Sequence, residues 1–404
     1  MKITSRYFNP TSFAIFILII WDALKAYLQL SAPLIQAAIL MPVILLGIFH
    51  NLNNNLLKTV FSRPAIFWLL WIIYALINTF LITGHYHEHN PFVFVSSVVI
   101  AFLLFCFIIV SKSNTSDLIN VLIFSYSARL LLSFVFDVFG YGAYEDVARF
   151  GVEFNANVIA FGALFLILLT ILRKASINSL RIIDYAMILT AITTIIITAS
   201  RKNYISLIVI AFGYIYIFRS KDFIKNTAKV ISFILILFVF INWTVKNTEI
   251  GNRLINVYEK AVYAEQIEKM FDHRMGYYIY GWQIFKDNPI NGIGLRNYPY
   301  VNRSLHVLHT EYMVQLTECG IIGTFLFVFF YGYIIKWLFL IRRKIIPYRK
   351  ITETYLLFML TMFILFLNTW IYNLPVMWVL IALSVRFIRE TKTSITYTQL
   401  EVSK

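Results

Sequence analysis

Residues 93–111 read VFVSSVVIAFLLFCFIIVS, a run without a single charged side chain. A helix needs about 20 such residues to cross the hydrocarbon core of a bilayer. Comparable runs recur from one end of the chain to the other, and the chain is 60% hydrophobic with only 14% charged residues. Soluble domains carry about 25% charged residues. The sequence therefore predicts an all-α polytopic membrane protein.

By this length criterion the chain contains about twelve spans. They cover residues 12–30, 33–50, 65–84, 93–111, 119–138, 154–172, 183–199, 204–218, 229–245, 312–340, 353–371 and 375–388. Each is expected to be unbroken, because lipid offers no partner to a freed backbone group. The predicted organisation is nine spans over 1–245, a long loop over 246–310, three spans over 311–390 and a tail over 391–404. The first run follows Lys2 and Arg6 but has no small-residue cleavage site, so we read it as a span rather than a signal peptide.

The basic residues of the short loops predict the orientation. They gather on one side of the predicted membrane: Lys58, Arg63, Arg173, Lys174, Arg181, Arg219, Lys221, Lys225, Arg342, Arg343 and Lys344. With an even number of spans, Arg386, Arg389 and Lys392 lie on that side too. Short loops rich in Lys and Arg stay in the cytoplasm, so both termini are predicted there and the 246–310 loop outside. Much of the net charge of +15 is this orientation signal. Nucleic acid is a poor partner for it, since no nucleic-acid-binding fold is visible.

Arg201 stands between two predicted spans in the sequence Ser200-Arg201-Lys202-Asn203. An arginine so close to hydrocarbon is costly unless it reaches the headgroups or pairs with an anion. Two interpretations remain open: a snorkelling side chain and an anion clamp that faces a cavity.

Arg274 precedes a group of aromatic residues that includes Tyr278 and Trp282. Such residues either form the aromatic belt of a membrane interface or stack on sugar rings. The sequence Asn288-Pro289 and the Gly292-x-Gly294 pair that follow predict a tight turn after a short helix.

His309 ends the long loop where the next span begins. A histidine at this position is either an ordinary surface residue or a general base, because a neutral imidazole accepts a proton near pH 7. Glu311 and Glu318 lie close enough in sequence to orient it, and His306 is a competing base. Cys106 and Cys319 form neither a disulfide framework nor a metal motif.

Together these residues resemble the O-antigen ligase/polymerase family of bacterial membrane glycosyltransferases. The resemblance rests on Ser200-Arg201, Arg274, Trp282, Phe285-x-x-Asn288-Pro289-x-x-Gly292-x-Gly294, His309-Thr310 and Gly320-Ile321-Ile322-Gly323, with a further likeness over Arg149–Asn157. The family has Asn, Ser or Gln after the histidine, where this chain has Thr310.

The resemblance implies an inverting enzyme of the bacterial inner membrane, with its site on the periplasmic face and no metal or other cofactor. The donor would be an oligosaccharide linked to undecaprenyl diphosphate. Arg201 and Arg274 would hold the diphosphate and His309 would be the base. Further candidates for binding the diphosphate or the glycan are Arg149, Asn157, Tyr278, Trp282, Arg296 and Arg303.

Three functions remain open at this point. A polymerase joins lipid-linked repeat units and would work beside a chain-length regulator, and overall resemblance favours it. A ligase moves the finished chain to lipid A–core with the same leaving group and base. A flippase for lipid-linked oligosaccharides would also need many spans and basic residues, but not a long outer loop carrying Arg, His and turn elements together.

Overall fold

The computed structural model describes residues 9–27, 33–52, 56–82, 91–138, 156–178, 180–198, 201–219, 267–301, 308, 310–367, 369 and 374–402. Every regular element in these ranges is helical. The chain divides into two compact units, one of residues 1–125 and 280–404 and one of residues 126–279.

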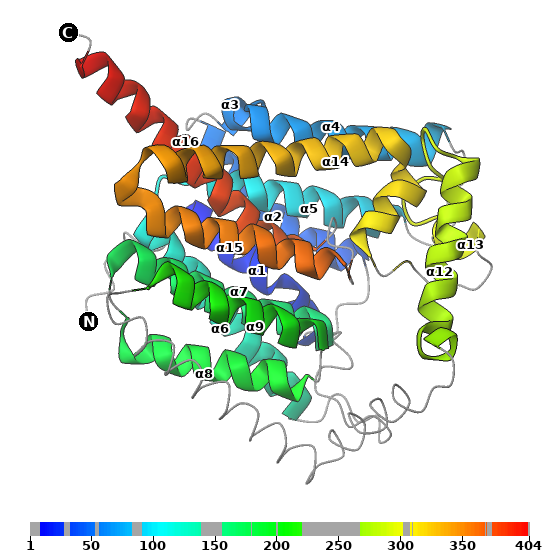
Figure 1. Ribbon diagram of the computed structural model, residues 1–404, viewed down its shortest axis with the longest axis horizontal. Helices are drawn as coiled ribbons and strands as arrows, with labels where there is room; N and C mark the ends of the chain where they lie inside the picture. The colour runs from blue at the N-terminus through cyan, green and yellow to red at the C-terminus, as the bar shows by residue number, and fades with distance from the viewer. Residues whose placement is uncertain are drawn as a thin grey trace. The chain divides into compact units, whose positions relative to one another are not determined.

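The first unit contains most of the long helices (Figure 1). They are α1 (Pro10–Tyr27), α2 (Pro33–Leu52), α3 (Leu56–Val60), α4 (Arg63–Ile77) with a π-helical turn η1 (Asn78–Ile82), α5 (Pro91–Val110), α13 (Tyr298–Val301), α14 (Glu311–Lys344), the 3-10 turn η2 (Ile346–Tyr348), α15 (Arg349–Phe366) and α16 (Pro375–Val402). α14 packs against α4 and α15, α16 against α5, and α1 against α2.

The second unit is built on α7 (Ala156–Ile177), which packs against α8 (Ile182–Ile197) and α9 (Arg201–Ile217). α6 (Thr115–Val138) and α12 (Ile267–Asp287) each begin in one unit and end in the other. A buried ion pair closes the α7–α8 connection, where Arg173 Nη1 lies 2.7 Å from Asp184 Oδ1. The other oxygen of Asp184 accepts the N–H of Arg181 and caps the start of α8.

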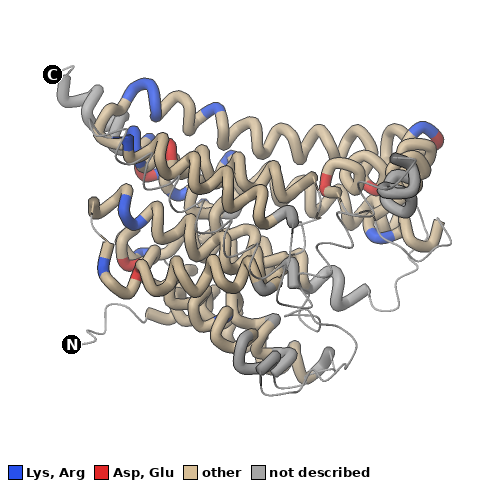
Figure 2. Tube along the Cα trace, turned by 60° about the horizontal axis from the view of Figure 1, so that its bottom comes forward, with Lys and Arg blue, Asp and Glu red and all other residues tan. Residues whose placement is uncertain are grey.

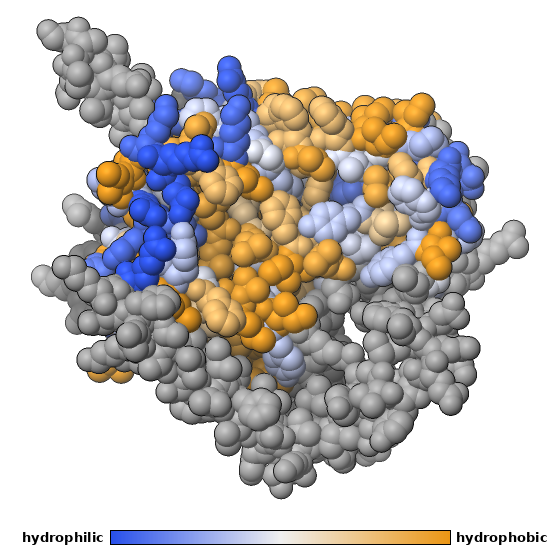
Figure 3. Space-filling view, viewed as in Figure 1, coloured by the Kyte–Doolittle hydropathy of each residue, from blue (hydrophilic) through white to orange (hydrophobic). Residues whose placement is uncertain are grey.

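Helices occupy the described parts of the predicted spans, and 229–245 lies outside the described residues. The number of spans stays a prediction. By length and composition, three of these helices are long and apolar enough to cross a membrane: Arg63–Leu81, Val158–Ile177 and Glu311–Lys344. Large hydrophobic side chains such as Ile321, Phe325 and Val328 point outward from α14. Hydrophobic residues cover the flanks of α14 and α15 in Figure 3, as lipid-facing surfaces require. The protein is therefore a helical membrane protein.

An aromatic cluster fills the centre of the first unit. The rings of Trp68 and Trp71 stack with their centroids 4.5 Å apart, and Trp378 of α16 lies 3.9 Å from Trp68. Phe105 and Phe330 close the cluster from α5 and α14. These rings are fully buried, so α4, α5, α14 and α16 share one core.

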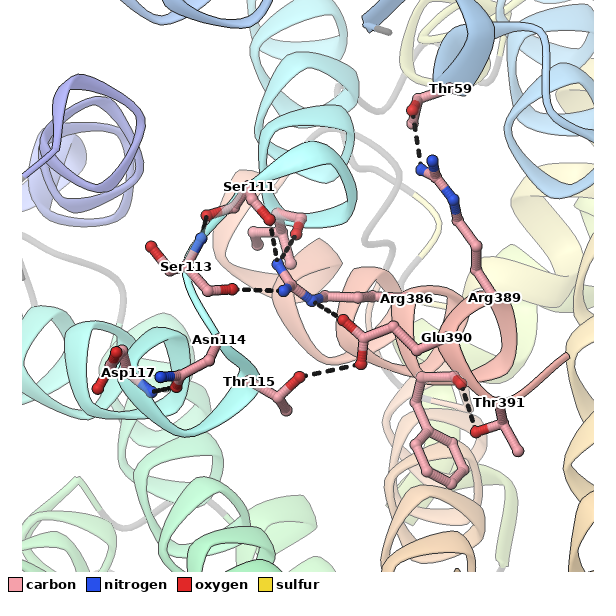
Figure 4. A network of polar contacts seen from close by, with 12 residues as sticks. Thr59, Ser111, Ser113, Asn114, Thr115, Asp117, Arg386, Arg389, Glu390 and Thr391 are labelled. Atoms are coloured by element: carbon pink, nitrogen blue, oxygen red, sulfur yellow. Dashed lines mark hydrogen bonds and ion pairs between the residues drawn. The ribbon is translucent and has the colours of Figure 1, made fainter. Parts of the chain in front are cut away.

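Charged residues lie mostly near the helix ends along the chain trace (Figure 2), and Arg386 shows that some of them have structural roles. Its guanidinium donates to the carbonyl oxygens of Ile108, Ser111 and Ser113 at 3.1, 2.9 and 2.6 Å, and its Nε donates to Glu390 at 2.8 Å (Figure 4). The last carbonyls of a helix lack partners within the helix. Arg386 of α16 therefore satisfies carbonyl groups at the end of α5 and links the two helices.

Cysteine labelling tests the predicted orientation. Lys286 and Lys344 are exposed at the ends of α12 and α14, while the native Cys106 and Cys319 are buried and should react slowly. We expect a membrane-impermeant maleimide to label Lys286→Cys in intact spheroplasts and Lys344→Cys only after permeabilisation, because long loops translocate and short basic loops do not. The reverse pattern would contradict the orientation.

Candidate functional site

The predicted site residues fall into three groups. Tyr278, Trp282 and Arg296 are described with their side chains. Three more are placed by their backbone alone: Arg201 begins α9, Asn157 is the second residue of α7, and Arg274 lies within α12. Arg149, Arg303 and His309 lie outside the described residues.

The turn after α12 forms as the sequence predicts. α12 ends at Asp287, and the N–H of Gly292 bonds back to the carbonyl of Asn288 at 2.9 Å. Gly292 and Gly294 have φ angles of 68° and 85°, values that glycine adopts without the penalty of a side chain. The residues from Asn288 to Asn297, which we call the docking turn, lead from α12 to α13.

α14 is broken at Gly320, which corrects the prediction of an unbroken span over 312–340. Gly320 has φ 62° and ψ −165°, a conformation that is essentially restricted to glycine. The break frees carbonyls before Gly320 and N–H groups after it. Such groups must find partners, because an unpaired backbone group inside the membrane costs several kcal/mol.

The docking turn supplies these partners. Its Ile293 and Gly294 N–H groups donate to the carbonyls of Thr317 and Glu318 at 3.0 and 2.8 Å. In return, the N–H groups of Ile321 and Ile322 donate to the carbonyls of Pro289 and Ile290 at 2.8 and 3.3 Å. The two glycine motifs of the family resemblance are therefore the two sides of one backbone joint.

The backbones of the docking turn and α14 approach so closely that neither Gly292 nor Gly320 has room for a side chain. A Cβ on Gly320 would lie 2.3 Å from the carbonyl oxygen of Ile290, and a Cβ on Gly292 would lie 2.6 Å from the carbonyl carbon of Glu318. Close backbone approach is the physical reason for glycine at both positions.

Polar residues at the end of α4 hold the joint from the other side, and sequence analysis missed them. Asn78 Nδ2 donates to the Asn291 carbonyl at 2.6 Å, and the Tyr74 hydroxyl donates to the Cys319 carbonyl at 2.8 Å. The Thr79 hydroxyl accepts the N–H of Leu295 at 2.8 Å. The available signal was the pair Asn78-Thr79 inside an apolar run. The π-helical turn that begins at Asn78 is a feature often found at functional sites.

The break makes the first part of α14 fold back along the second. In a straight helix Tyr312 and Tyr331 would be separated by about 28 Å. Instead, the Tyr312 hydroxyl donates to the Phe363 carbonyl at 3.3 Å and the ring of Tyr331 lies 5.7 Å from that of Phe363. Figure 1 shows the bend, with the first part of α14 leading from the end of α15 to the joint.

Thr310 fixes the beginning of this half-helix. Its hydroxyl donates to the carbonyl of Phe366, at the last turn of α15, at 3.0 Å. Thr310 is the position at which the sequence departs from the usual residues of the family. A small hydroxyl side chain suits this contact, so the departure has a structural use.

Two buried carboxylates follow in the half-helix, and they have different partners. Glu311 Oε1 accepts from Gln315 Nε2, and Gln315 Oε1 accepts from Trp71 Nε1, both at 2.8 Å. Glu318 Oε2 accepts the N–H of Arg296 at 2.9 Å. Glu318 thus belongs to the docking turn, whereas Glu311 remains the candidate for orienting His309, two residues before it.

The aromatic residues of α12 divide between packing and exposure. The Tyr280 ring lies 6.2 Å from that of Tyr298, and its hydroxyl donates to the Val301 carbonyl at 3.2 Å. Trp282 is 46% exposed and lies 5.2 Å from Phe285, and Tyr278 is half-buried. Of these rings, Trp282 offers the most surface to a partner.

The comparison with protein families agrees with this arrangement. Residues 186–328 match the model of a family described as O-Antigen ligase. The match contains Arg201, Arg274, the docking turn and the break in α14, whereas Arg149 and Asn157 lie before it. A comparison with curated proteins gave no match. The predicted resemblance is confirmed over residues 186–328, which are similar to the family described as O-Antigen ligase.

Proposed function

We propose that the protein is a polymerase of O-antigen or a related surface polysaccharide. It transfers a glycan from undecaprenyl diphosphate to a sugar hydroxyl of a lipid-linked repeat unit at the periplasmic face of the bacterial inner membrane. The family match over residues 186–328 supports the glycan transfer, because that segment contains Arg201, Arg274 and His309 together. The choice of a polymerase rests on the overall resemblance of the sequence.

The proposed reaction is a single displacement. The acceptor hydroxyl oxygen attacks the anomeric carbon, the bond from that carbon to the diphosphate oxygen breaks, and the hydroxyl proton passes to His309. Attack from the face opposite the diphosphate inverts the anomeric configuration. The diphosphate leaves with the bonding electron pair, so its negative charge must be stabilised as the bond breaks.

Arginines are suited to that task without a metal ion. A guanidinium presents a planar fork of N–H donors that matches phosphate oxygens, and each charge-assisted hydrogen bond contributes about 1.5–3 kcal/mol. In this proposal Arg201 and Arg274 bind the diphosphate, with Arg149, Arg296 and Arg303 as further ligands. Asn157, Tyr278 and the exposed Trp282 contact the glycan, whose apolar sugar faces stack on aromatic rings.

Substitution of the two arginines tests the leaving-group assignment. We expect Arg201→Lys and Arg274→Lys each to lower turnover roughly tenfold or more, because an ammonium cannot reproduce the fork. Transfer rates of purified, correctly inserted protein provide the measurement. Arg181→Ala is the matched control, since Arg181 is exposed and should retain wild-type activity. Full activity of both Arg201→Ala and Arg274→Ala would refute the assignment.

A ligase is the second candidate, and the family's description favours it. Its acceptor is lipid A–core instead of another lipid-linked unit. The deciding experiment supplies purified protein with an undecaprenyl-diphosphate-linked repeat unit, with and without lipid A–core. Longer lipid-linked glycans support the polymerase, and a chain-length regulator should then narrow their size distribution. Glycan on lipid A–core supports the ligase.

The same assay tests the transporter alternative. A flippase moves its lipid-linked substrate between leaflets and leaves the glycan unchanged. Unaltered glycan in every reaction, together with movement of the donor across a proteoliposome membrane, would contradict the proposed transferase.

A further inference from the structure

Arg296 has an unusual backbone for a residue with a long side chain. Its φ is 63°, in the left-handed region that glycine and asparagine adopt more readily. The other residues with positive φ in the docking turn are both glycines. A strained conformation persists only where surrounding contacts hold it, and such residues cluster at functional sites.

The contacts that hold Arg296 come from Glu318 and its neighbours. Glu318 is only 4% exposed, and its carboxylate accepts the Arg296 N–H at 2.9 Å. The backbone of Tyr298 also donates to this carboxylate, which interacts electrostatically with the positive charge of Arg296. Asn297 Nδ2 donates to the Ile293 carbonyl at 2.7 Å and closes the turn on itself.

Arg296 is more exposed than the residues on either side of it. Leu295, Asn297 and Tyr298 are buried, with exposed fractions of 2% or less, while Arg296 between them is half-buried. The break in α14 contributes twice to this arrangement, since the Glu318 carbonyl binds Gly294 and the Glu318 side chain binds Arg296. A turn that only had to reverse the chain would be less strained with glycine at this position.

We propose that Glu318 is a positioning residue that presents the Arg296 guanidinium to the diphosphate of the lipid-linked donor. This inference rests on the proposed function. It assigns part of the recognition of the donor diphosphate to the contact between the docking turn and α14. Arg296 lies in the same compact unit as Leu308 and Thr310, which flank the proposed base. Arg296 would therefore bind the leaving diphosphate from the same compact unit that contains the proposed base. Glu318 would fix the orientation of Arg296 for that contact.

A binding measurement separates positioning from simple electrostatics. Purified wild type, Arg296→Ala, Glu318→Ala and the double variant are titrated with undecaprenyl diphosphate that carries no glycan. Removing the Glu318 charge alone should tighten binding of an anion, whereas loss of positioning should weaken it. We expect Arg296→Ala and Glu318→Ala each to weaken binding about tenfold or more, and the double variant to bind no more weakly than Arg296→Ala alone.

Further variants keep the test independent of folding. Glu318→Gln retains an oxygen that accepts the Arg296 N–H, so it should bind as well as wild type or better. Glu318→Asp, which draws the carboxylate back by one methylene, replaces Glu318→Ala in the cycle if that variant does not fold. Arg296→Gly relieves the backbone strain and should lose affinity while keeping its thermal midpoint. Glu353→Ala is the matched control, because Glu353 is also buried but pairs with Arg342 and Arg349.

The outcomes distinguish the inference from the function on which it rests. Tighter binding by Glu318→Ala, losses that multiply in the double variant, or wild-type affinity of Arg296→Gly would each overturn the role of Glu318. Wild-type protein that fails to bind undecaprenyl diphosphate would instead overturn the proposed function.

Discussion

Replacing His309 by alanine is expected to lower the rate of glycan transfer about 10²–10⁴-fold, the usual loss when a general base is removed. Binding of the lipid-linked donor should persist, because the proposal assigns the diphosphate to the arginines and not to His309. The measurement is single-turnover transfer with purified protein at saturating donor.

The pH dependence of the wild-type reaction provides a second test of the base. Only the neutral imidazole accepts the hydroxyl proton, so the rate should fall as the pH drops and the imidazole becomes protonated. His309→Ala should lose this acid limb along with most of its activity.

His306→Ala is the matched control, since it removes another imidazole three residues away in the same loop. It should retain most of the transfer rate and the same acid limb. Near-normal turnover of His309→Ala combined with an inactive His306→Ala would show that the base is His306.

Replacing Gly320 by alanine should destabilise the protein by about 3 kcal/mol or more, because backbone strain and overpacking act together. The new Cβ would lie 2.3 Å from the Ile290 carbonyl oxygen, and the φ of 62° would be strained for any side chain. We expect a lower thermal midpoint in detergent and a smaller yield of monodisperse protein.

Gly332→Ala is the control for this substitution in the same helix. A Cβ on Gly332 meets nothing within 4 Å, and alanine is the better helix former by about 1 kcal/mol. Its thermal midpoint should equal or exceed that of wild type. Equal midpoints for Gly320→Ala and Gly332→Ala would contradict the joint between the docking turn and α14.

The family glycines can be assigned a role only with the structure in hand. The sequence predicts a turn at Gly292-x-Gly294, and the turn is present. It does not predict that the turn closes a break in a helix that begins at Glu311, well after the turn in sequence. A glycine inside an apolar run is tolerated in a helix, so Gly320 alone gives no reason to expect a break. Asn78 and Glu318 act through the same long-range contact, so the sequence alone does not reveal their roles either.

The sequence by itself predicts the helical membrane class and a helix over each long apolar run that the structure describes. Long apolar runs such as 93–111 must satisfy every backbone group internally once water is absent, and only a helix does this within one segment. Tertiary structure alone decides where that rule is relaxed. At Gly320 the freed backbone groups find partners in residues 289–294, so a break that would be costly in isolation is stable here. The left-handed Arg296 is stable for a related reason, because a carboxylate brought in by the folded-back half of α14 binds its N–H group.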